Sequence, residues 1–231
     1  MIVSVHQPHY LPWLGYFDKI DQSDLFVILD EVQYKKREYQ NRNRIKSAGG
    51  ELWLTVPVVT RGRYEQRMKE VEIDYGTDWR RKHLNAFELN YRRAGFFNEY
   101  FSGLSGFYAG APRRLLAELN TAMTVYFMKE IGVKTEIVLE SELGVGGTST
   151  ERIINICGKT GADVYLSGSG GKEYMNEQLF DEAGIKLVYQ KYEHPSYRQL
   201  FGGFLPYMSI ADLLFNEGPA SLEIIRKGRA A

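Results

Sequence analysis

Cysteine is almost absent from this chain of 231 residues, because Cys157 is its only one. An internal disulfide is therefore excluded, as is typical of proteins from a reducing compartment. The neighbouring Ile153, Ile154 and Ile156 predict a buried cysteine on a helix, not a nucleophile. Long apolar runs are missing too, since none approaches the roughly 20 residues that span a bilayer. The first residues lack the charged start of a signal peptide, so we expect a cytoplasmic protein with no membrane span.

The chain also lacks an excess of either charge. Its 29 Lys and Arg residues balance 29 Asp and Glu residues, so the formal net charge is zero. Proteins that bind nucleic acid usually carry a basic excess, so the balance favours a small polar ligand or a protein partner. Aromatic residues, in contrast, reach 13%, and 16 of them are tyrosines. Tyrosine has a flat apolar face and a hydroxyl, which suits contact with sugars and bases, although a tyrosine-rich core explains the same composition.

Apolar runs separated by turn residues predict an α/β fold, a three-layer Rossmann-like domain with a mostly parallel sheet. Ile2–Val5 and Leu25–Leu29 are predicted strands joined by a helix that starts at Pro12, which is typical of a parallel βαβ unit. Thr148 and Glu151 predict a capping box at the start of a later helix. The other elements are expected as strands at 51–58, 71–73, 135–139, 164–166 and 186–192, and as helices at 148–161 and 209–215.

Two stretches depart from this alternation. Residues 77–131 have helical periodicity and predict a mainly helical insertion, interrupted by an aromatic and glycine-containing stretch at 96–110. Residues 33–50 are basic, polar and poor in core-forming side chains, and predict a long exposed loop, a kind of segment that is usually functional. No repeat or linker divides the chain, so residues 1–231 are expected to form a single domain.

Four of the predicted strands are followed by polar, chain-reversing clusters. These clusters are His6-Gln7-Pro8, Asp30-Glu31, Ser141-Glu142 and Ser167-Gly168-Ser169. In open parallel sheets, ligands bind outside the carboxyl ends of the strands, where the strand order reverses. We therefore expect the four clusters to converge on one edge of the sheet and to form the binding site.

Histidine is the candidate for acid–base chemistry. His6 leaves a buried strand, so it is placed to act as a general base, a hydrogen-bond donor or a metal ligand. A structural histidine bonded to a backbone carbonyl is the alternative. His6, His9 and Asp30 could in principle hold a metal, but no His-x₃-His spacing or cysteine ligand supports one, so no metal is expected. His194 is a candidate second acid–base group, or a cap of the last strand.

A glycine-rich turn, Ser167-Gly168-Ser169-Gly170-Gly171-Lys172, resembles a phosphate-binding nest. Successive glycines let backbone N–H groups approach an anion, and the lysine that follows would neutralise it. The turn lacks the Walker spacing, and a flexible connection between a strand and a helix is the alternative. Gly144–Thr148 offers a second anion-binding helix start. Together they predict phosphate or carboxylate binding.

The basic segment within residues 33–50 carries Lys35, Lys36, Arg37, Arg42, Arg44 and Lys46. Arginine and lysine of this density could clamp a nucleotide-sugar or a lipid-linked pyrophosphate. A solvated loop without a ligand is the alternative. The polar run Gln40-Asn41-Arg42-Asn43-Arg44 favours binding.

The motifs of the chain resemble those of the WbqC-like family, outside the helical middle. The resemblance rests on His6-Gln7-Pro8-x-Tyr10-Leu11-Pro12-Trp13-x-Gly15-Tyr16-Phe17, on Asp30, Gln33 and Tyr34, on Gln40-Asn41-Arg42-Asn43, on Ser167-Gly168-x-Gly170-Gly171 with Tyr174, on His194-Pro195-x-Tyr197-x-Gln199, and on Ser209-Ile210-x-Asp212-Leu213-Leu214-Phe215-Asn216. It implies a place in bacterial lipopolysaccharide O-antigen or related glycan pathways. It also implies transfer of an aminoacyl group, such as glycyl, to an amino sugar.

The sequence thus predicts a transferase that acts on an amino-sugar or nucleotide-sugar intermediate. The expected catalytic residues are His6, Asp30 and His194. The expected substrate-binding residues are Gln7, Tyr10, Trp13, Gln33, Tyr34, Asn41, Arg42, Asn43, Ser167, Gly168, Gly170, Gly171, Lys172, Tyr174, Tyr197, Gln199 and Asp212. Two alternatives stay open, namely an ATP-dependent nucleotidyltransferase-like enzyme or ligase that uses ATP with magnesium, and a non-catalytic glycan or nucleotide-sugar binding protein. A homo-oligomer is compatible with all three.

Overall fold

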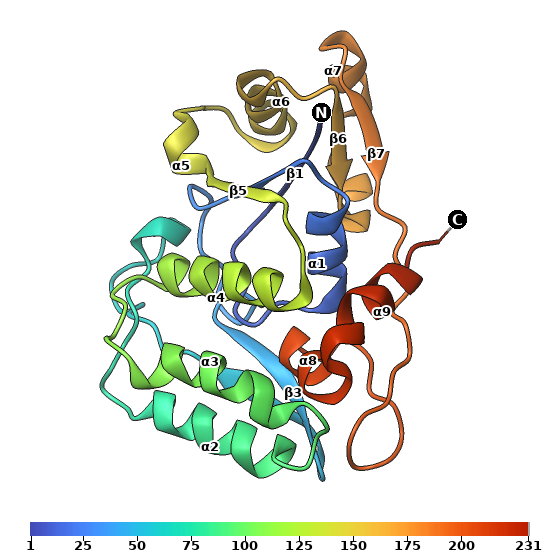
Figure 1. Cartoon of the computed structure of the whole chain (residues 1–231). Helices are drawn as coiled ribbons and strands as arrows, with labels where there is room; N and C mark the ends of the chain where they lie inside the picture. The colour runs from blue at the N-terminus through green and yellow to red at the C-terminus, as the bar shows by residue number, and fades with distance from the viewer. Residues whose placement is uncertain (231) are drawn as a thin grey trace.

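A five-stranded parallel sheet forms the centre of the protein (Figure 1), whose computed structural model describes residues 1–230. The strand order is β5-β2-β1-β6-β7, and every neighbouring pair is parallel. The strands are β1 (Ile2–His6), β2 (Leu25–Ile28), β5 (Glu136–Leu139), β6 (Val164–Ser167) and β7 (Lys186–Tyr189). The predicted Rossmann-like α/β fold with a mostly parallel sheet is therefore confirmed. The chain adds β2 and β5 on one side of β1 and β6 and β7 on the other, so the strand order reverses between β1 and β6.

Helices cover both faces of the sheet because the side chains of a strand alternate between its two faces. On one face, Val3 and Val5 pack with Ile153 of α6 (Ser149–Thr160) and Phe180 of α7 (Glu177–Glu182). Cys157 of α6 is buried in the same cluster, as predicted, and burial raises the pKa of its thiol to about 12.

On the other face, Phe26 and Ile28 of β2 belong to a second apolar cluster. This cluster includes Phe17 of α1 (Leu14–Asp21), Phe127 of α4 (Leu116–Ile131) and Leu213 of α8 (Ile210–Glu217). The helix α1 connects β1 to β2, so the predicted βαβ unit is confirmed. The closing elements are η3 (Gly218–Ala220) and α9 (Ser221–Lys227).

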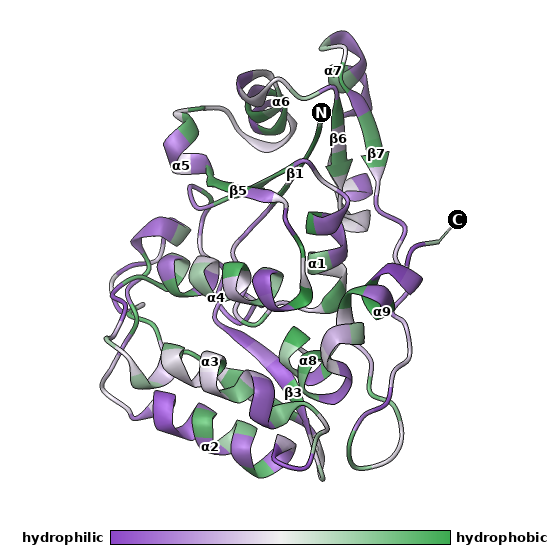
Figure 2. Ribbon diagram, viewed as in Figure 1, coloured by the Kyte–Doolittle hydropathy of each residue, from purple (hydrophilic) through white to green (hydrophobic). Residues whose placement is uncertain are grey.

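The prediction of an exposed loop over residues 33–50 was wrong for its second half. Residues Arg42–Ser47 form β3, which pairs antiparallel with β4 (Gly50–Thr55). Figure 2 shows why the sequence pattern missed β3, since this strand is mainly hydrophilic. Two of its polar side chains, Asn43 and Lys46, are buried and donate to backbone oxygens, as when Asn43 Nδ2 donates to Leu11 O at 2.6 Å.

Three smaller expectations also differ from the structure. The stretch 96–110 contains α3 (Phe97–Ala109), a full helix between α2 (Trp79–Tyr91) and α4. Residues 71–73 make isolated bridges near η1 (Met68–Glu70) instead of a strand. Thr148 occupies the N-cap of α6, but its side chain makes no capping hydrogen bond. No helix within residues 1–230 is long and apolar enough to cross a membrane.

Candidate functional site

A cavity of about 260 Å³, the smaller cavity, lies at the carboxyl ends of β1 and β6. This is the point where the strand order reverses, the usual ligand position in open α/β sheets. Its walls come from β1, from α1, from α6 and from the turn η2 (Ser169–Glu173) that follows β6. The lining residues are Val5, His6, Gln7, Lys19, Leu29, Ile153, Tyr165, Ser167, Gly168, Gly170, Gly171 and Tyr174.

His6 contributes a neutral imidazole to the smaller cavity. Its Nδ1 lies 3.0 Å from Gln7 O, and because a carbonyl can only accept, Nδ1 carries the hydrogen and Nε2 is left unprotonated. Burial, together with the nearby Lys19, holds the pKa of His6 well below its usual range. The His9 ring packs edge-on at 4.5 Å, and burial lowers its pKa to about 3. His6 is therefore an uncharged base at neutral pH.

Lys19 of α1 is the site residue that the sequence predictions missed. Its Nζ donates to Val5 O at 2.9 Å, and the residue is only 3% exposed. Within residues 1–230 no carboxylate lies within 4 Å of this nitrogen. Burial lowers the pKa of Lys19 to about 7. The signal in the sequence is a lysine one residue before Ile20, in a short helix that joins two mostly apolar strands.

The glycine-rich turn closes the smaller cavity next to Lys19. A Cβ on Gly168 would lie 3.7 Å from Lys19 Nζ, and one on Gly171 would lie 2.1 Å from Ser167 Oγ. The turn can take this conformation because residue 171 is a glycine and has no Cβ. Lys172, expected to neutralise the anion, instead places its Nζ 5.2 Å from the centroid of the Tyr189 ring and is absent from the cavity wall. The cation beside this turn comes from α1.

A second cavity of about 490 Å³, the larger cavity, adjoins the first. The two share Gln7, Leu29, Ile153 and Tyr174, and Tyr174 is 63% exposed. The remaining lining residues are Glu31, Val32, Gln33, Lys35, Thr148, Ser149 and Arg152. The two cavities together offer a smaller end of about 260 Å³ and a larger end of about 490 Å³.

Gln7 lies between the cavities with its amide held in one orientation. Gln40 Nε2 donates to Gln7 Oε1 at 2.5 Å, and Gln40 Oε1 accepts from Lys35 N at 2.8 Å. Gln40 itself is fully buried. Because the oxygen of the Gln7 amide is occupied, its NH₂ group is the part available to a ligand. Gln40, not predicted as a site residue by itself, therefore orients Gln7.

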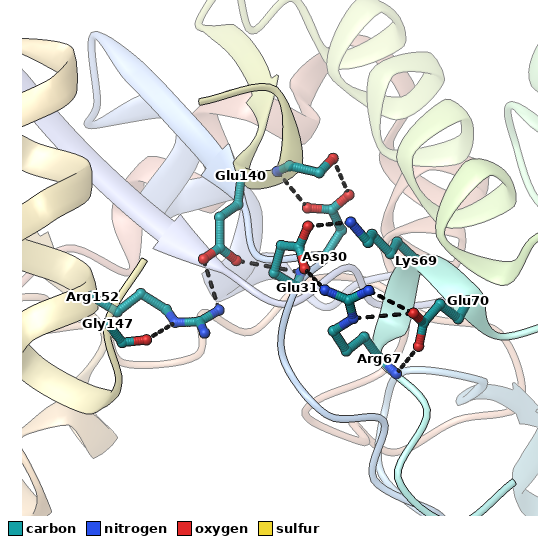
Figure 3. A network of polar contacts seen from close by, with 9 residues as sticks. Asp30, Glu31, Arg67, Lys69, Glu70, Glu140, Gly147 and Arg152 are labelled. Carbon is teal, nitrogen blue, oxygen red and sulfur yellow. Dashed lines mark hydrogen bonds and ion pairs between the residues drawn. The ribbon is translucent and has the colours of Figure 1, made fainter. Parts of the chain in front are cut away.

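A polar network ties the ends of β2 and β5 together beside the larger cavity (Figure 3). Arg152 donates to Glu140 Oε1 at 2.8 Å and to Gly147 O at 3.0 Å. Glu140 has no exposed side-chain area, and its other oxygen accepts from Glu31 N at 3.4 Å. Glu31 in turn pairs with Arg67 and with a lysine of η1. The network fixes the wall of the larger cavity.

Asp30, an expected catalytic residue, has both carboxylate oxygens bonded to Ser141. Its Oδ1 accepts from Ser141 N at 2.9 Å and its Oδ2 accepts from Ser141 Oγ at 2.6 Å. The residue is 2% exposed and lines neither cavity. The four strand ends that were expected to form one site therefore form two separate groups. The ends of β1 and β6 form the smaller cavity, and the ends of β2 and β5 are bonded to each other.

The motif residues near the carboxyl terminus gather around Asp212 of α8. Tyr91 Oη donates to Oδ1 at 2.6 Å, while Tyr197 Oη and Gln199 Nε2 donate to Oδ2 at 2.7 and 2.8 Å. Burial raises the pKa of Asp212. Nearby, His194 stacks on Trp13 at 6.3 Å. None of Trp13, His194, Tyr197, Gln199 and Asp212 lines the two cavities.

Of the other expected binding residues, all but Gln33 are absent from the lining of the two cavities. The Tyr10 hydroxyl is buried and bonded to His83 Nδ1 at 2.8 Å. Asn41 Nδ2 donates to Val56 O at 2.9 Å. Arg42 stacks on Trp53, with 4.5 Å between its guanidinium carbon and the ring centroid. Asn43 donates to Leu11 O, as described above, and Tyr34 is buried. Gln33 is the one residue of this set that lines the larger cavity. Within residues 1–230, no three His, Cys, Asp or Glu side chains are grouped to hold a metal.

Comparison with known proteins identifies the family over nearly all of the chain. Residues 7–224 match the sequence model described as the WbqC-like protein family. A protein of Mycobacterium tuberculosis, named uncharacterized protein Rv1507c, is 39% identical over 225 residues, which make up 97% of either chain. No solved structure shows a significant similarity. The chain belongs to the WbqC-like protein family.

Proposed function

We propose that the protein is an enzyme that transfers an acyl group, such as an aminoacyl group, to the amine of an amino sugar in bacterial glycan assembly. The observation that carries the proposal is the neutral His6 imidazole in the smaller cavity, with Nδ1 bonded to Gln7 O and Nε2 left as a base. Within residues 1–230, Nε2 has no hydrogen-bond partner. An unoccupied basic nitrogen at a strand end is the group that an attacking amine requires.

The reaction that these residues support is amide formation. The amine nitrogen attacks the acyl carbon and loses a proton to His6 Nε2, so the positive charge moves onto the imidazole. The carbonyl becomes an oxyanion, to which the NH₂ group of Gln7 would donate, because the oxygen of that amide accepts from Gln40. The bond from the acyl carbon to the leaving group then breaks, and its electron pair departs with that group. His6 returns the proton to the leaving group or to water.

The two adjoining cavities suit a reaction between two substrates. The smaller cavity holds His6 and has room for the reacting groups, whereas the larger cavity has nearly twice the volume. Lys35, Arg152 and Gln33 line the larger cavity and offer donors to hydroxyl and phosphate oxygens of a nucleotide-sugar. In this arrangement the sugar crosses from the larger to the smaller cavity beside Gln7 and Tyr174.

The order of the strands supports a second candidate, an ATP-dependent ligase. Nucleotides bind at the reversal point of such sheets, and the smaller cavity lies there. Magnesium prefers carboxylate and carbonyl oxygens. No carboxylate from residues 1–230 lines the smaller cavity, and Glu31 at the larger cavity is already paired with Arg67. The described lining of the two cavities therefore offers magnesium no unpaired carboxylate, and in this candidate function the metal would arrive with the nucleotide.

The test compares two histidines with opposite placements. Wild type, His6→Gln and His194→Gln are incubated with a nucleotide-linked amino sugar and a panel of acyl donors, and the amide is detected by mass spectrometry. Because a positioned general base contributes ~100-fold or more, we expect His6→Gln to lose at least that factor in kcat. His194→Gln removes an imidazole outside both cavities and should retain most of the rate.

Two outcomes would contradict the proposal. A His6→Gln variant that is folded and as fast as wild type removes His6 from the chemistry. Absence of amide with every donor, together with tight binding of the amino sugar, would favour a non-catalytic binding protein. Folding is checked by thermal unfolding of each variant.

A further inference from the structure

We propose that Lys19 binds a phosphoryl group in the smaller cavity, and that the acyl donor is therefore one activated through phosphate, such as an acyl phosphate or an acyl adenylate. The proposal names the donor class for the transfer described above and rests on that function. It follows from the position of a buried lysine that the motif comparison did not single out.

Lys19 has fewer acceptors around it than its ammonium group can use. Lys19 Nζ has one protein acceptor, Val5 O at 2.9 Å, although an ammonium group has three hydrogens to donate. Within residues 1–230 it forms no salt bridge. An ammonium buried without a counter-ion is costly, so a ligand with negative charge would remove that cost. Burial lowers the pKa of Lys19 to about 7, which agrees with the missing counter-ion.

The rest of the cavity wall carries no negative charge at neutral pH. His6 and Lys19 are the ionisable nitrogens of the lining, and the described lining contains no Asp or Glu. Tyr165 and Tyr174 also line the cavity, and burial raises the pKa of both phenols, so neither supplies a negative charge at neutral pH. His9, which faces His6, stays neutral for the reason given above. An anion in this cavity meets no fixed negative charge.

There is room for a ligand beside Lys19 Nζ. Gly168 carries no side chain next to Lys19 Nζ, and a Cβ on Gly170 would meet no atom within 4 Å. The glycines therefore leave open volume on the turn side of the lysine. Ser167 also lines this end of the cavity. A phosphoryl group, with three acceptor oxygens, suits a lysine ammonium that has two hydrogens left to donate.

An anion bound by Lys19 would lie in the same cavity as His6. The smaller cavity measures about 260 Å³ and contains both His6 and Lys19, so an anion bound by Lys19 belongs to the reacting end of a substrate. A phosphoryl group bonded to the acyl carbon meets this condition. When the amine attacks, the bond between acyl carbon and phosphate oxygen breaks, and the oxygen leaves with the electron pair. Lys19 then stabilises the departing phosphate, while the amine proton goes to His6.

The binding experiment compares two lysines. Inorganic phosphate is titrated into wild type, Lys19→Met and Lys172→Met by isothermal calorimetry. Since a hydrogen bond to a charged group is worth about tenfold or more in affinity, we expect Lys19→Met to bind phosphate at least tenfold more weakly. Lys172→Met should bind within about twofold of wild type. Equal binding by Lys19→Met and wild type, or an equal loss in Lys172→Met, overturns the proposal.

A measurement on the wild-type protein covers the case in which Lys19→Met does not fold. Cyanate adds to uncharged amines, and the carbamylation of Lys19 is followed by peptide mass spectrometry with and without saturating phosphate. We expect phosphate to slow carbamylation at Lys19 and to leave Lys172 unchanged. The same rate at Lys19 in both conditions overturns the proposal.

The donor experiment separates this inference from the proposed function. Amide formation is assayed with acetyl phosphate, with ATP plus a free amino acid, and with an acyl thioester. Product from either of the first two, and not from the thioester, supports the inference and tells a ready acyl phosphate from an adenylate formed on the enzyme. Product from the thioester alone overturns the inference and keeps the transferase. Phosphate binding through Lys19 with no product from any donor overturns the transferase and leaves only a phosphate site.

Discussion

Single residues decide the chemistry of the site, and burial acts in the same direction on His6 and Lys19. Loss of water disfavours the charged form of each side chain, so His6 is a neutral base, and the pKa of Lys19 falls to about 7, where a bound anion would stabilise its charged form. His6 was predictable because it follows an apolar strand. Lys19 was not, because a helix pattern shows which side faces the sheet but not that a lysine nitrogen turns towards the end of the strand. Its bond to Val5 O is a tertiary contact.

The burial of Lys19 gives a prediction for the pH dependence of stability. Its pKa falls from an ordinary 10.5 to about 7 on folding. Between these values the unfolded chain holds a proton that the folded protein has released, so the free energy of unfolding rises with pH. For this residue the rise from about pH 7 to about pH 9 is about 2 kcal/mol. Denaturant unfolding at both pH values should show that rise in wild type and a rise smaller by this amount in Lys19→Met. The same pH dependence in the two proteins would rule out a depressed pKa.

At the scale of elements, the strands of the central sheet were predictable from their apolar runs, and the hairpin of β3 and β4 only in part. β1, β2, β5 and β6 are short, mostly apolar runs, and turn residues precede the last three, so hydrophobicity marks them. β3 is polar because its side chains bond to distant backbone groups, which no local pattern reveals. α3 was hidden by aromatic and glycine residues of low helix propensity. Its burial against α2 and α8 outweighs that propensity.

The turn after β6 is the element whose shape the site needs most. In Gly171→Ala, the new Cβ would lie 2.1 Å from Ser167 Oγ and 3.3 Å from Ser167 Cβ, so the hydroxyl must rotate and the turn must shift. We expect a stability loss of ~1 kcal/mol and phosphate affinity several-fold weaker in calorimetry. Gly158→Ala on α6 is the matched control, because its Cβ meets no atom within 4 Å. A Gly171→Ala protein that binds phosphate like the control would show that the turn does not shape the site.

For the whole molecule, the order of the strands determines where chemistry can occur. The reversal between β1 and β6 leaves a gap above their carboxyl ends, and α1 and α6 approach it from opposite faces of the sheet. The sequence predicted such an edge because alternating strands and helices imply a parallel sheet. It could not tell which strand ends would meet, since that depends on the pairing of β1 with β6, which are far apart along the chain. The residues around Asp212 are therefore part of the motif but not of the cavity.

Both the proposed function and the role of Lys19 require that substrate binds in the smaller cavity. A crystal structure of the protein with a phosphonate analogue of an acyl phosphate tests this most directly. We expect phosphonate oxygens within about 3 Å of Lys19 Nζ, and the acyl group between His6 and Gln7. An analogue seated elsewhere, for example in the hollow lined by Leu89 and Phe97, with none of it beside Lys19, would contradict the account.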